Sequence, residues 1–341
     1  GGFDMPIEYT SIIEEHNAVR HAAGIFDVSH MGEVLITGVD AEKYVNHIFT
    51  NDVREIEPGQ ILYGMMLYPS GGGVHDLLGY KKSSTEYFLV INASNIAKDY
   101  AWIVENSNGF DVTLENQSDR FGEVAVQGPK AEEMIEKHLS FKVSDLGFYT
   151  FKELTYHGQT ILVSRTGYTG EDGFEIYAAP EIINEVWDIL VGSKEVAPCG
   201  LGCRDTLRFE VALPLYGHEL SDEITPIESG LSMFVKLNKP EFIGKEAMQR
   251  QKEQGVMQKV VGIELHDKAI PRSGYDVEVE GVKVGYVTTG YNSISTGRSV
   301  CMALIDSQYA TLGAEVDIRI RKKVFKGTVC KKRFYQKNYK K

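Results

Sequence analysis

The chain has 341 residues, of which 43% are hydrophobic and 25% charged, and its formal net charge is −12. This is ordinary globular composition, with enough chain for about two or three domains and no apolar run long enough to span a membrane. Four cysteines are too few for a disulfide scaffold, which favours a reducing compartment. Cys199 and Cys203 lack the second Cys or His pair of a zinc site, so we expect no metal.

The first two thirds of the chain alternate between helices and strands. Residues 11–22 predict a helix, because Ser11 can cap it and acidic residues fill its first turn. Other helices are expected from Gly128-Pro129, where proline suits the first turn, within residues 199–215, and at residues 40–49, 94–105, 180–191 and 245–253. Strands are expected from Glu175 onward and at residues 33–37, 61–68, 74–80, 87–92, 124–127, 151–156 and 160–164. The alternation indicates an α/β or α+β fold.

From residue 256 the pattern changes to short strands and glycine turns without a convincing helix, which predicts a small β domain. We therefore divide the chain into residues 1–240, which form two interleaved α/β lobes, a helical linker at 241–255, and a β domain with a basic tail at 256–341. Lys and Arg occupy eleven positions from Arg319 to Lys341, where Asp and Glu are absent. Such a tail can bind nucleic acid, a membrane or an acidic protein. It contains no recognisable nucleic-acid motif.

The glycine-rich stretch at residues 71–80, GGGVHDLLGY, reads as a turn followed by a strand. Alternate side chains of a strand share a face, so Asp76 and Tyr80 point one way and His75 the other. A carboxylate and a phenol on one face can line a pocket wall. On this stretch alone, a solvated surface aspartate at a strand end is the favoured interpretation, because lone carboxylates are mostly solvated.

Several common catalytic motifs are missing from the sequence. The glycine-rich turn at residues 167–173 is not followed by Lys-Ser/Thr, so it is not a P-loop. Gly200 and Gly202 lack the third glycine and upstream strand of a dinucleotide site. Neither a nucleophile elbow nor a zinc-protease helix is present.

Polar and aromatic residues near the predicted turns are the remaining candidates for a site. They are Asp76, Tyr80, Asn92, Glu175 and Arg208, with ring faces from Tyr63, Tyr168 and Phe174. Carboxylate, amide, guanidinium and aromatic groups together suit a flat heterocycle with several N–H and C=O groups. Composition does not establish that these side chains converge.

Several motifs in collinear order resemble the T protein of the glycine cleavage system. They are FDVSHMGE at 26–33, TND at 50–52, AVQGPKA at 125–131, RTGYTGEDGFE at 165–175, GLGCRDTLRFE at 200–210, LYGHEL at 215–220, FIGKEA at 242–247 and IPRSGY at 270–275. The resemblance implies an α+β fold of three domains around a central cavity that holds tetrahydrofolate. It also implies an aminomethyltransferase, which moves the methylene of a lipoyl-bound aminomethyl group to tetrahydrofolate and releases ammonia and 5,10-methylenetetrahydrofolate.

The resemblance also assigns roles to single residues. Asp76 matches the catalytic carboxylate near folate N5 and N10, and Glu175 matches the carboxylate that pairs with the amino edge of the pterin. Arg208 matches a guanidinium beside the pterin. The residues expected along the folate are Tyr63, Tyr80, Asn92 and Tyr168. A carboxylate such as Asp76 could stabilise a cationic iminium-like species, orient N5 or accept a proton from N10.

The sequence departs from the family pattern in three places. His75 replaces the first of two adjacent aspartates. Strand alternation points His75 away from the site, which favours a change that leaves the chemistry unaltered over one that changes it. Residues 292–296, NSIST, replace a Ser-Pro-Thr turn, which could affect the lipoyl entrance. A short family segment precedes the position of Gly1; either it is omitted from this sequence, or its loss would affect docking of the carrier.

Two rival functions use the same fold. One is a folate-dependent demethylase of a small N-, O- or S-methyl substrate. The other is a non-catalytic folate-binding protein, although the related assembly factors carry a cysteine in the motif that here reads FIGKE at 242–246.

The partner that the resemblance implies is the lipoylated H carrier protein, and we expect neither nucleic acid nor membrane as a partner. An acidic carrier could be steered by the basic residues Lys323, Lys326, Lys331, Lys332 and Arg333. The expected compartment is the cytoplasm of a bacterium, or the mitochondrial matrix of a eukaryote.

Overall fold

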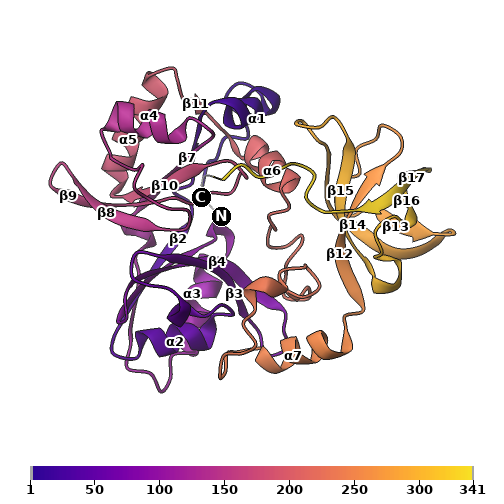
Figure 1. Cartoon of the computed structure of the whole chain (residues 1–341), viewed down its shortest axis with the longest axis horizontal. Helices are drawn as coiled ribbons and strands as arrows, with labels where there is room; N and C mark the ends of the chain where they lie inside the picture. The colour runs from indigo at the N-terminus through magenta and orange to yellow at the C-terminus, as the bar shows by residue number, and fades with distance from the viewer. Residues whose placement is uncertain (1–2, 340–341) are drawn as a thin grey trace.

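The structure is a computed structural model that describes residues 3–339. Its described strands form two open sheets and a closed barrel (Figure 1). The longer helices are α1 (Ile12–His21), α2 (Ala41–Ile48), α3 (Ile96–Glu105), α4 (Ala131–Leu139), α5 (Pro180–Gly192), α6 (Leu201–Glu210) and α7 (Lys245–Gln254). Helix α1 begins as predicted, because the Ser11 side chain accepts a 3.2 Å hydrogen bond from the backbone N–H of Glu14.

The first sheet is five-stranded and antiparallel, and helices α2 and α3 cover one of its faces. Its strands in spatial order are β3 (Ile61–Leu67), β4 (Gly73–Ser83), β5 (Glu86–Ile91), β2 (Gly32–Thr37) and β6 (Thr113–Asn116). Val34 and Ile36 of β2 pack against Val45 and Ile48 of α2 in a fully buried core. Period-two alternation therefore leaves Glu33 on the face turned away from these helices.

The second sheet is six-stranded, with α4 and α5 on one face. Its strands in spatial order are β11 (Ala197–Pro198), β1 (Gly24–Asp27), β7 (Gly122–Gln127), β10 (Gly173–Ala178), β9 (Gln159–Ser164) and β8 (Phe151–Tyr156). Val124 of β7 and Ile176 of β10 pack against the helices. The side chains between them, including Glu123 and Glu175, therefore lie on the opposite face.

The two sheets meet through the faces that carry no helices. Tyr80 and Phe88 of the first sheet form one buried cluster with Phe151 and Tyr177 of the second. The rings of Tyr80 and Tyr177 pack edge to face with centroids 5.8 Å apart. A pocket that Tyr177 helps to line lies beside this contact.

The C-terminal part is a closed six-stranded barrel, which confirms the predicted small β domain and the α+β class. Its strands in spatial order are β12 (Gln258–Leu265), β15 (Ser299–Asp306), β14 (Val282–Asn292), β13 (Asp276–Val279), β16 (Glu315–Ile320) and β17 (Lys323–Cys330). Figure 1 shows the barrel separated from the two sheets by α6 and the chain that follows it.

A buried polar network fastens the barrel to α1 and α6. Glu210 of α6 accepts hydrogen bonds from Ser293 at 2.6 Å and from the Ser295 hydroxyl at 2.5 Å. It also pairs with Arg20 of α1 at 3.1 Å, and His16 lies 3.3 Å away. The turn at residues 292–296, which departs from the family pattern, thus has a docking role at this domain junction.

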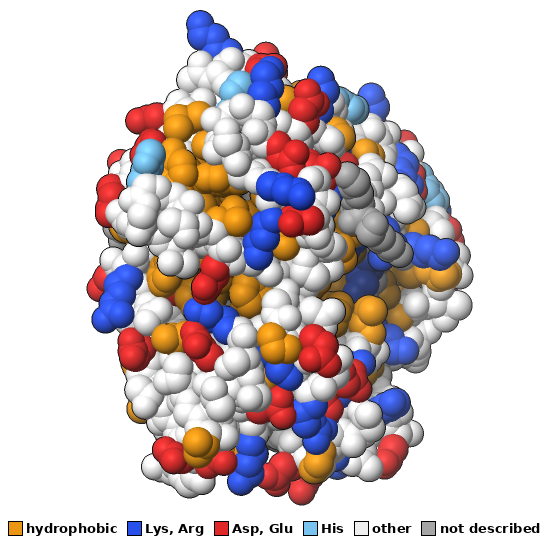
Figure 2. Space-filling model, turned by 60° about the vertical axis from the view of Figure 1, so that its left-hand side comes forward, with side chains coloured by type: hydrophobic (Ala, Val, Ile, Leu, Met, Phe, Trp, Pro, Cys, Tyr) orange, Lys and Arg blue, Asp and Glu red, His pale blue; other side chains and the backbone are white. Residues whose placement is uncertain are grey.

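The described part of the basic C-terminal segment, up to Tyr339, packs against the chain that precedes β10. The backbone N–H of Asn338 donates a 2.8 Å hydrogen bond to the carbonyl of Gly170, and the ring of Tyr339 stacks on Phe148. On the face shown in Figure 2, acidic and basic side chains are interspersed. Within the described part of the chain, every helix is too short or too polar to cross a bilayer.

Candidate active site

A pocket opens where the two sheets meet, and it has about 830 Å³ of space, part of it open to solvent. Its walls are Met31, Tyr63, Asp76, Leu77, Leu78, Val90, Asn92, Glu123, Tyr149, Gly167, Tyr168, Glu175, Tyr177, Arg204, Leu213, Pro214, Leu215 and Tyr216. A second, outer pocket shares four of these residues: Asn92, Tyr168, Arg204 and Leu215.

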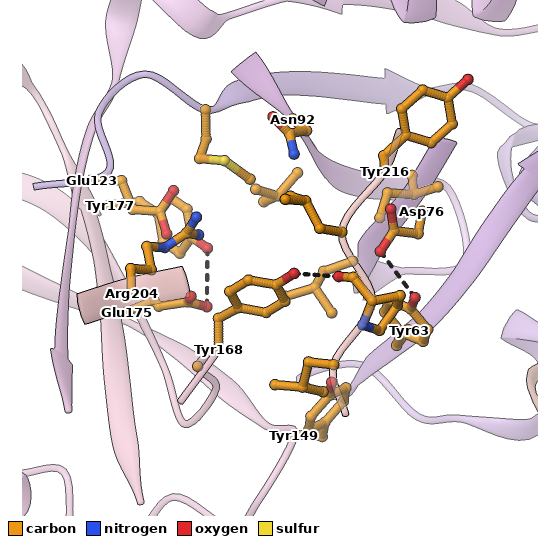
Figure 3. A pocket seen from close by; sticks show the side chains of 18 residues that line it. Tyr63, Asp76, Asn92, Glu123, Tyr149, Tyr168, Glu175, Tyr177, Arg204 and Tyr216 are labelled. Carbon is orange, nitrogen blue, oxygen red and sulfur yellow. Dashed lines mark hydrogen bonds between the residues drawn. The ribbon is translucent and has the colours of Figure 1, made fainter. Parts of the chain in front are cut away.

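Asp76 reaches the pocket from β4 and lies within the glycine-rich stretch at residues 71–80. Its Oδ2 accepts a 2.9 Å hydrogen bond from the hydroxyl of Tyr63 on the neighbouring strand β3 (Figure 3). The β3–β4 turn requires glycine, because a Cβ on Gly72 would lie only 1.7 Å from the carbonyl oxygen of Asp222. The tight turn and the antiparallel pairing together fix where the carboxylate lies.

His75 lies on the opposite face of β4, as side-chain alternation predicts. Its ring is fully buried, with Nδ1 hydrogen-bonded to the Asp99 carboxylate of α3. The ring also packs against Tyr216 at 4.5 Å between centroids. His75 is therefore outside the pocket wall and directly behind Asp76.

Most of the predicted site residues come together here. Tyr63, Asp76, Asn92, Tyr168 and Glu175 all line the inner pocket. They come from five different segments that the two sheets bring together, and Figure 3 shows Asp76 and Glu175 on opposite sides of the cavity. The Tyr168 hydroxyl donates to the carbonyl of Pro214, which holds its ring across the pocket.

Tyr80 and Arg208 lie elsewhere. Tyr80 is fully buried behind the pocket, and its hydroxyl lies 2.9 Å from that of Tyr177, which does line the cavity. Arg208 is fully buried in an ion pair with Glu219 at 2.8 Å and borders only the outer pocket. Neither side chain lines the inner pocket itself, although Tyr80 contacts the wall residue Tyr177 and Arg208 donates to the carbonyl of Leu213, also in the wall.

Five further polar side chains line the inner pocket and were not singled out from the sequence. They are Glu123, Tyr149, Tyr177, Arg204 and Tyr216. The guanidinium of Arg204 lies over the Tyr168 ring, 4.9 Å from its centroid. A signal for Arg204 was available, because it precedes Arg208 by four residues and so shares a helix face with it.

Comparison with known proteins identifies the family. Residues 1–239 match the model of the GCVT N-terminal domain, and residues 258–336 match that of the glycine cleavage T-protein C-terminal barrel domain. The chain belongs to the glycine cleavage T-protein family. This confirms the resemblance inferred from the collinear motifs.

Relatives in this family match over the full chain. A protein named aminomethyltransferase from Alkaliphilus oremlandii is 51% identical over 344 residues, which cover 100% of this chain and 94% of that protein. One of the same name from Lysinibacillus sphaericus is 50% identical and covers 99% and 93%. The crystal structure of glycine cleavage system aminomethyltransferase T from Bartonella henselae superposes with a TM-score of 0.95 at 28% identity, over 100% of this chain and 94% of that one.

Burial sets the electrostatics of this T-protein-family pocket. Burial raises the pKa of Asp76, and the nearby His75 and the Tyr63 hydrogen bond partly offset that rise. Burial also raises the pKa of Glu175, against which act a hydrogen bond from Thr166 and the charge of Arg204. The ionised form of a carboxyl group in such surroundings is stabilised when it binds N–H donors or a cation.

These contacts give a cavity whose two ends carry different polar groups. One end has Asp76 and Tyr63. The other has Glu175, Tyr177 and Arg204, with the Tyr168 ring between the two ends (Figure 3). A flat ligand with N–H donors on one edge and a reacting group at its far side fits this arrangement.

Proposed function

We propose that this chain is a tetrahydrofolate-dependent aminomethyltransferase of the glycine cleavage type. The observation that carries the proposal is the 51% identity over the whole chain to a protein named aminomethyltransferase, combined with a two-ended pocket between the sheets. The substrate is an aminomethyl group on the lipoyl sulfur of a carrier protein, and the acceptor is tetrahydrofolate.

The reaction exchanges two bonds of the transferred carbon for two others. Bonds from the carbon to the lipoyl sulfur and to the amine break, and bonds to folate N5 and N10 form. The protons lost from N5 and N10 appear on ammonia and on the lipoyl thiol. The products are therefore ammonia, dihydrolipoyl carrier and 5,10-methylenetetrahydrofolate, without any change in oxidation state.

We assign Asp76 to the reacting end. Its carboxylate lies in the pocket wall and is held by Tyr63, so it can orient N5, balance the positive charge of the iminium-like species and accept a proton from N10. Positioning accounts for the larger share of this effect, since the reacting nitrogens and the carbon must be held close together.

We assign Glu175 to the pterin end. A carboxylate accepts two parallel hydrogen bonds from adjacent N–H groups, and the aminopyrimidine edge of a pterin presents such a pair. Tyr63, Asn92 and Tyr168 lie along the cavity between the two carboxylates, where the rest of the folate would run. Arg204, rather than Arg208, supplies the guanidinium of the inner pocket in this proposal.

The carrier would approach from the side of the barrel, in the compartment where the carrier is made. We propose the bacterial cytoplasm, since the relatives described above are bacterial. Of the predicted steering residues, Lys323, Lys326, Lys331 and Arg333 are exposed. Lys332 is half-buried and donates to the carbonyl of Ser229, so it is the weakest candidate.

The test supplies purified protein with aminomethyl-lipoylated carrier and tetrahydrofolate, and quantifies ammonia and methylenetetrahydrofolate. The proposal predicts that both products form in equal amounts. Retained folate binding without turnover of the carrier substrate would contradict it. In that case, turnover of a small N-methyl, O-methyl or S-methyl compound would identify a demethylase instead.

A further inference from the structure

Glu123 is a buried carboxyl of the inner pocket to which no role has been assigned. It is 2% exposed, and its Oε2 has no hydrogen-bond partner among the described residues. An acid of this kind is costly to bury, since a buried polar oxygen without a partner destabilises the folded state. The folded protein would be more stable with a hydrophobic residue at this position, unless a ligand supplies the missing hydrogen-bond partner of Oε2.

Strand pairing places Glu123 beside the groups that recognise the ligand. Glu123 of β7 stands directly opposite Tyr177 of β10, and Glu175 stands opposite Ala125, two residues along β7 from Glu123. Side chains at such diagonal positions are about 7–8 Å apart or less and share one face of the sheet. In Figure 3, Glu123, Tyr177, Glu175 and Arg204 form one group at the same end of the cavity.

The surroundings of Glu123 favour its neutral form. Burial raises its pKa well above the usual range, and the nearby carboxyls of Glu175 and Glu33 add to that rise. The charge of Arg204 acts in the other direction, as does a hydrogen bond from Tyr177, but they do not outweigh burial. Glu33 faces this group from β2, and burial raises its own pKa to about 9. A cluster of this kind holds a proton on at least one of its carboxyls.

A neutral carboxylic acid and a carboxylate recognise different ligand edges. A carboxylate accepts from two donors, whereas a neutral acid donates through its O–H and accepts through its C=O. The pterin edge that Glu175 leaves unpaired offers one ring nitrogen acceptor next to an N–H donor. We propose that Glu123 binds this part of the pterin as a neutral acid. The neutral Glu123 and the ionised Glu175 would then bind different edges of the same heterocycle. The inference rests on the proposed function and deepens it.

The test measures the dissociation constant of tetrahydrofolate for a matched set of variants. Glu123→Gln keeps one donor and one acceptor in the same shape, so its affinity should stay within about threefold of wild type. Glu123→Leu keeps the volume but removes both groups and should weaken binding about tenfold or more, since two buried hydrogen bonds to the ligand are lost. Glu175→Gln is the matched control: it turns an acceptor into a donor facing a donor, and should also lose about tenfold or more.

Thermal unfolding of each variant separates a binding defect from a folding defect. Glu123→Leu should be at least as stable as wild type, because it removes an unpaired buried oxygen. Wild-type affinity in Glu123→Leu would overturn the contact with the ligand. Equal losses in Glu123→Gln and Glu123→Leu would overturn the neutral-acid assignment. Failure of the wild-type protein to bind tetrahydrofolate would overturn the proposed function and, with it, this inference.

Discussion

The Tyr63 hydroxyl donates a 2.9 Å hydrogen bond to Oδ2 of Asp76, from one strand of the first sheet to the next. The Tyr63 ring is itself fixed by an edge-to-face contact with Phe234, with centroids 4.8 Å apart. The catalytic carboxylate proposed here is therefore held by a side chain that is rigid at both ends. This orientation is available before any ligand binds, which reduces the cost of reaching the reactive geometry.

Replacing Tyr63 with Phe should change the pH dependence of turnover. The Tyr63 hydrogen bond lowers the pKa of Asp76 against the rise caused by burial. Its loss raises that pKa further, so the acid limb of the pH–rate profile should move to higher pH, and turnover at pH 7 should fall about three- to tenfold. An unchanged acid limb in steady-state assays would show that this hydrogen bond does not tune Asp76.

The two arginines of α6 should give opposite phenotypes. Arg204→Ala should weaken tetrahydrofolate binding about tenfold with little change in stability, because Arg204 lines the pocket and stacks on Tyr168. Arg208→Ala should destabilise the fold by about 3–5 kcal/mol, because it leaves Glu219 buried and unpaired. Ligand titration and denaturant unfolding of both variants separate these effects, and the reverse pattern would restore Arg208 as the pterin contact.

The exposed basic residues of the barrel should control the affinity for the carrier. Reversing Lys323, Lys326, Lys331 and Arg333 to Glu should raise the KM for the lipoyl carrier about tenfold and flatten its salt dependence. Lys142→Glu is the matched control, because Lys142 is exposed on the loop after α4. Wild-type carrier affinity that does not change from low to high ionic strength would contradict electrostatic steering.

The Glu210 network at the domain junction should make stability depend on acid pH. Burial would raise the pKa of Glu210, but hydrogen bonds from His16, Ser293 and Ser295 lower it to about 2. Because the folded-state pKa lies below the unfolded one, ionised Glu210 contributes stability above about pH 5 and loses it progressively towards pH 2. The shift corresponds to about 3 kcal/mol.

Denaturant unfolding of wild type and Glu210→Gln at several pH values tests this network. Glu210→Gln should be less stable than wild type at pH 7, and the difference should shrink as the pH falls below about 4. A difference that stays constant over this range would show that the charge of Glu210 has no part in holding the barrel.

The sequence predicted the parts of the fold that depend on local pattern. The strand after the glycine turn, the small β domain and the helix capped by Ser11 are all present. Alternation along β4 predicted that Asp76 and His75 point to opposite faces, and they do. Two helix starts were misplaced. Helix α3 begins at Ile96, because a 3₁₀ turn at Ala93–Asn95 comes first, and α4 begins at Ala131 rather than at Pro129.

The parts of the site that depend on tertiary packing could not be predicted from the local sequence pattern. Tyr80 shares a face with Asp76 but lies four residues along β4, which at about 3.3 Å per residue carries it into the contact between the sheets. Arg204 and Arg208 share a helix face, and only the docking of Glu219 shows which one is neutralised. Glu123 lies in a largely apolar run of the sequence. Its side chain joins the pocket wall only because β7 pairs with β10, and this pairing is not visible in the local sequence.

The role of Asp76 is tested most directly by a single-turnover experiment with saturating tetrahydrofolate and aminomethyl-lipoylated carrier, in which wild type is compared with Asp76→Asn. The wild-type protein should form ammonia and 5,10-methylenetetrahydrofolate in equal amounts. Asp76→Asn should bind tetrahydrofolate within about threefold of wild type but react about a hundredfold or more slowly, as the loss of a proton-accepting and charge-balancing group predicts. An Asp76→Asn variant that reacts as fast as wild type would contradict the account.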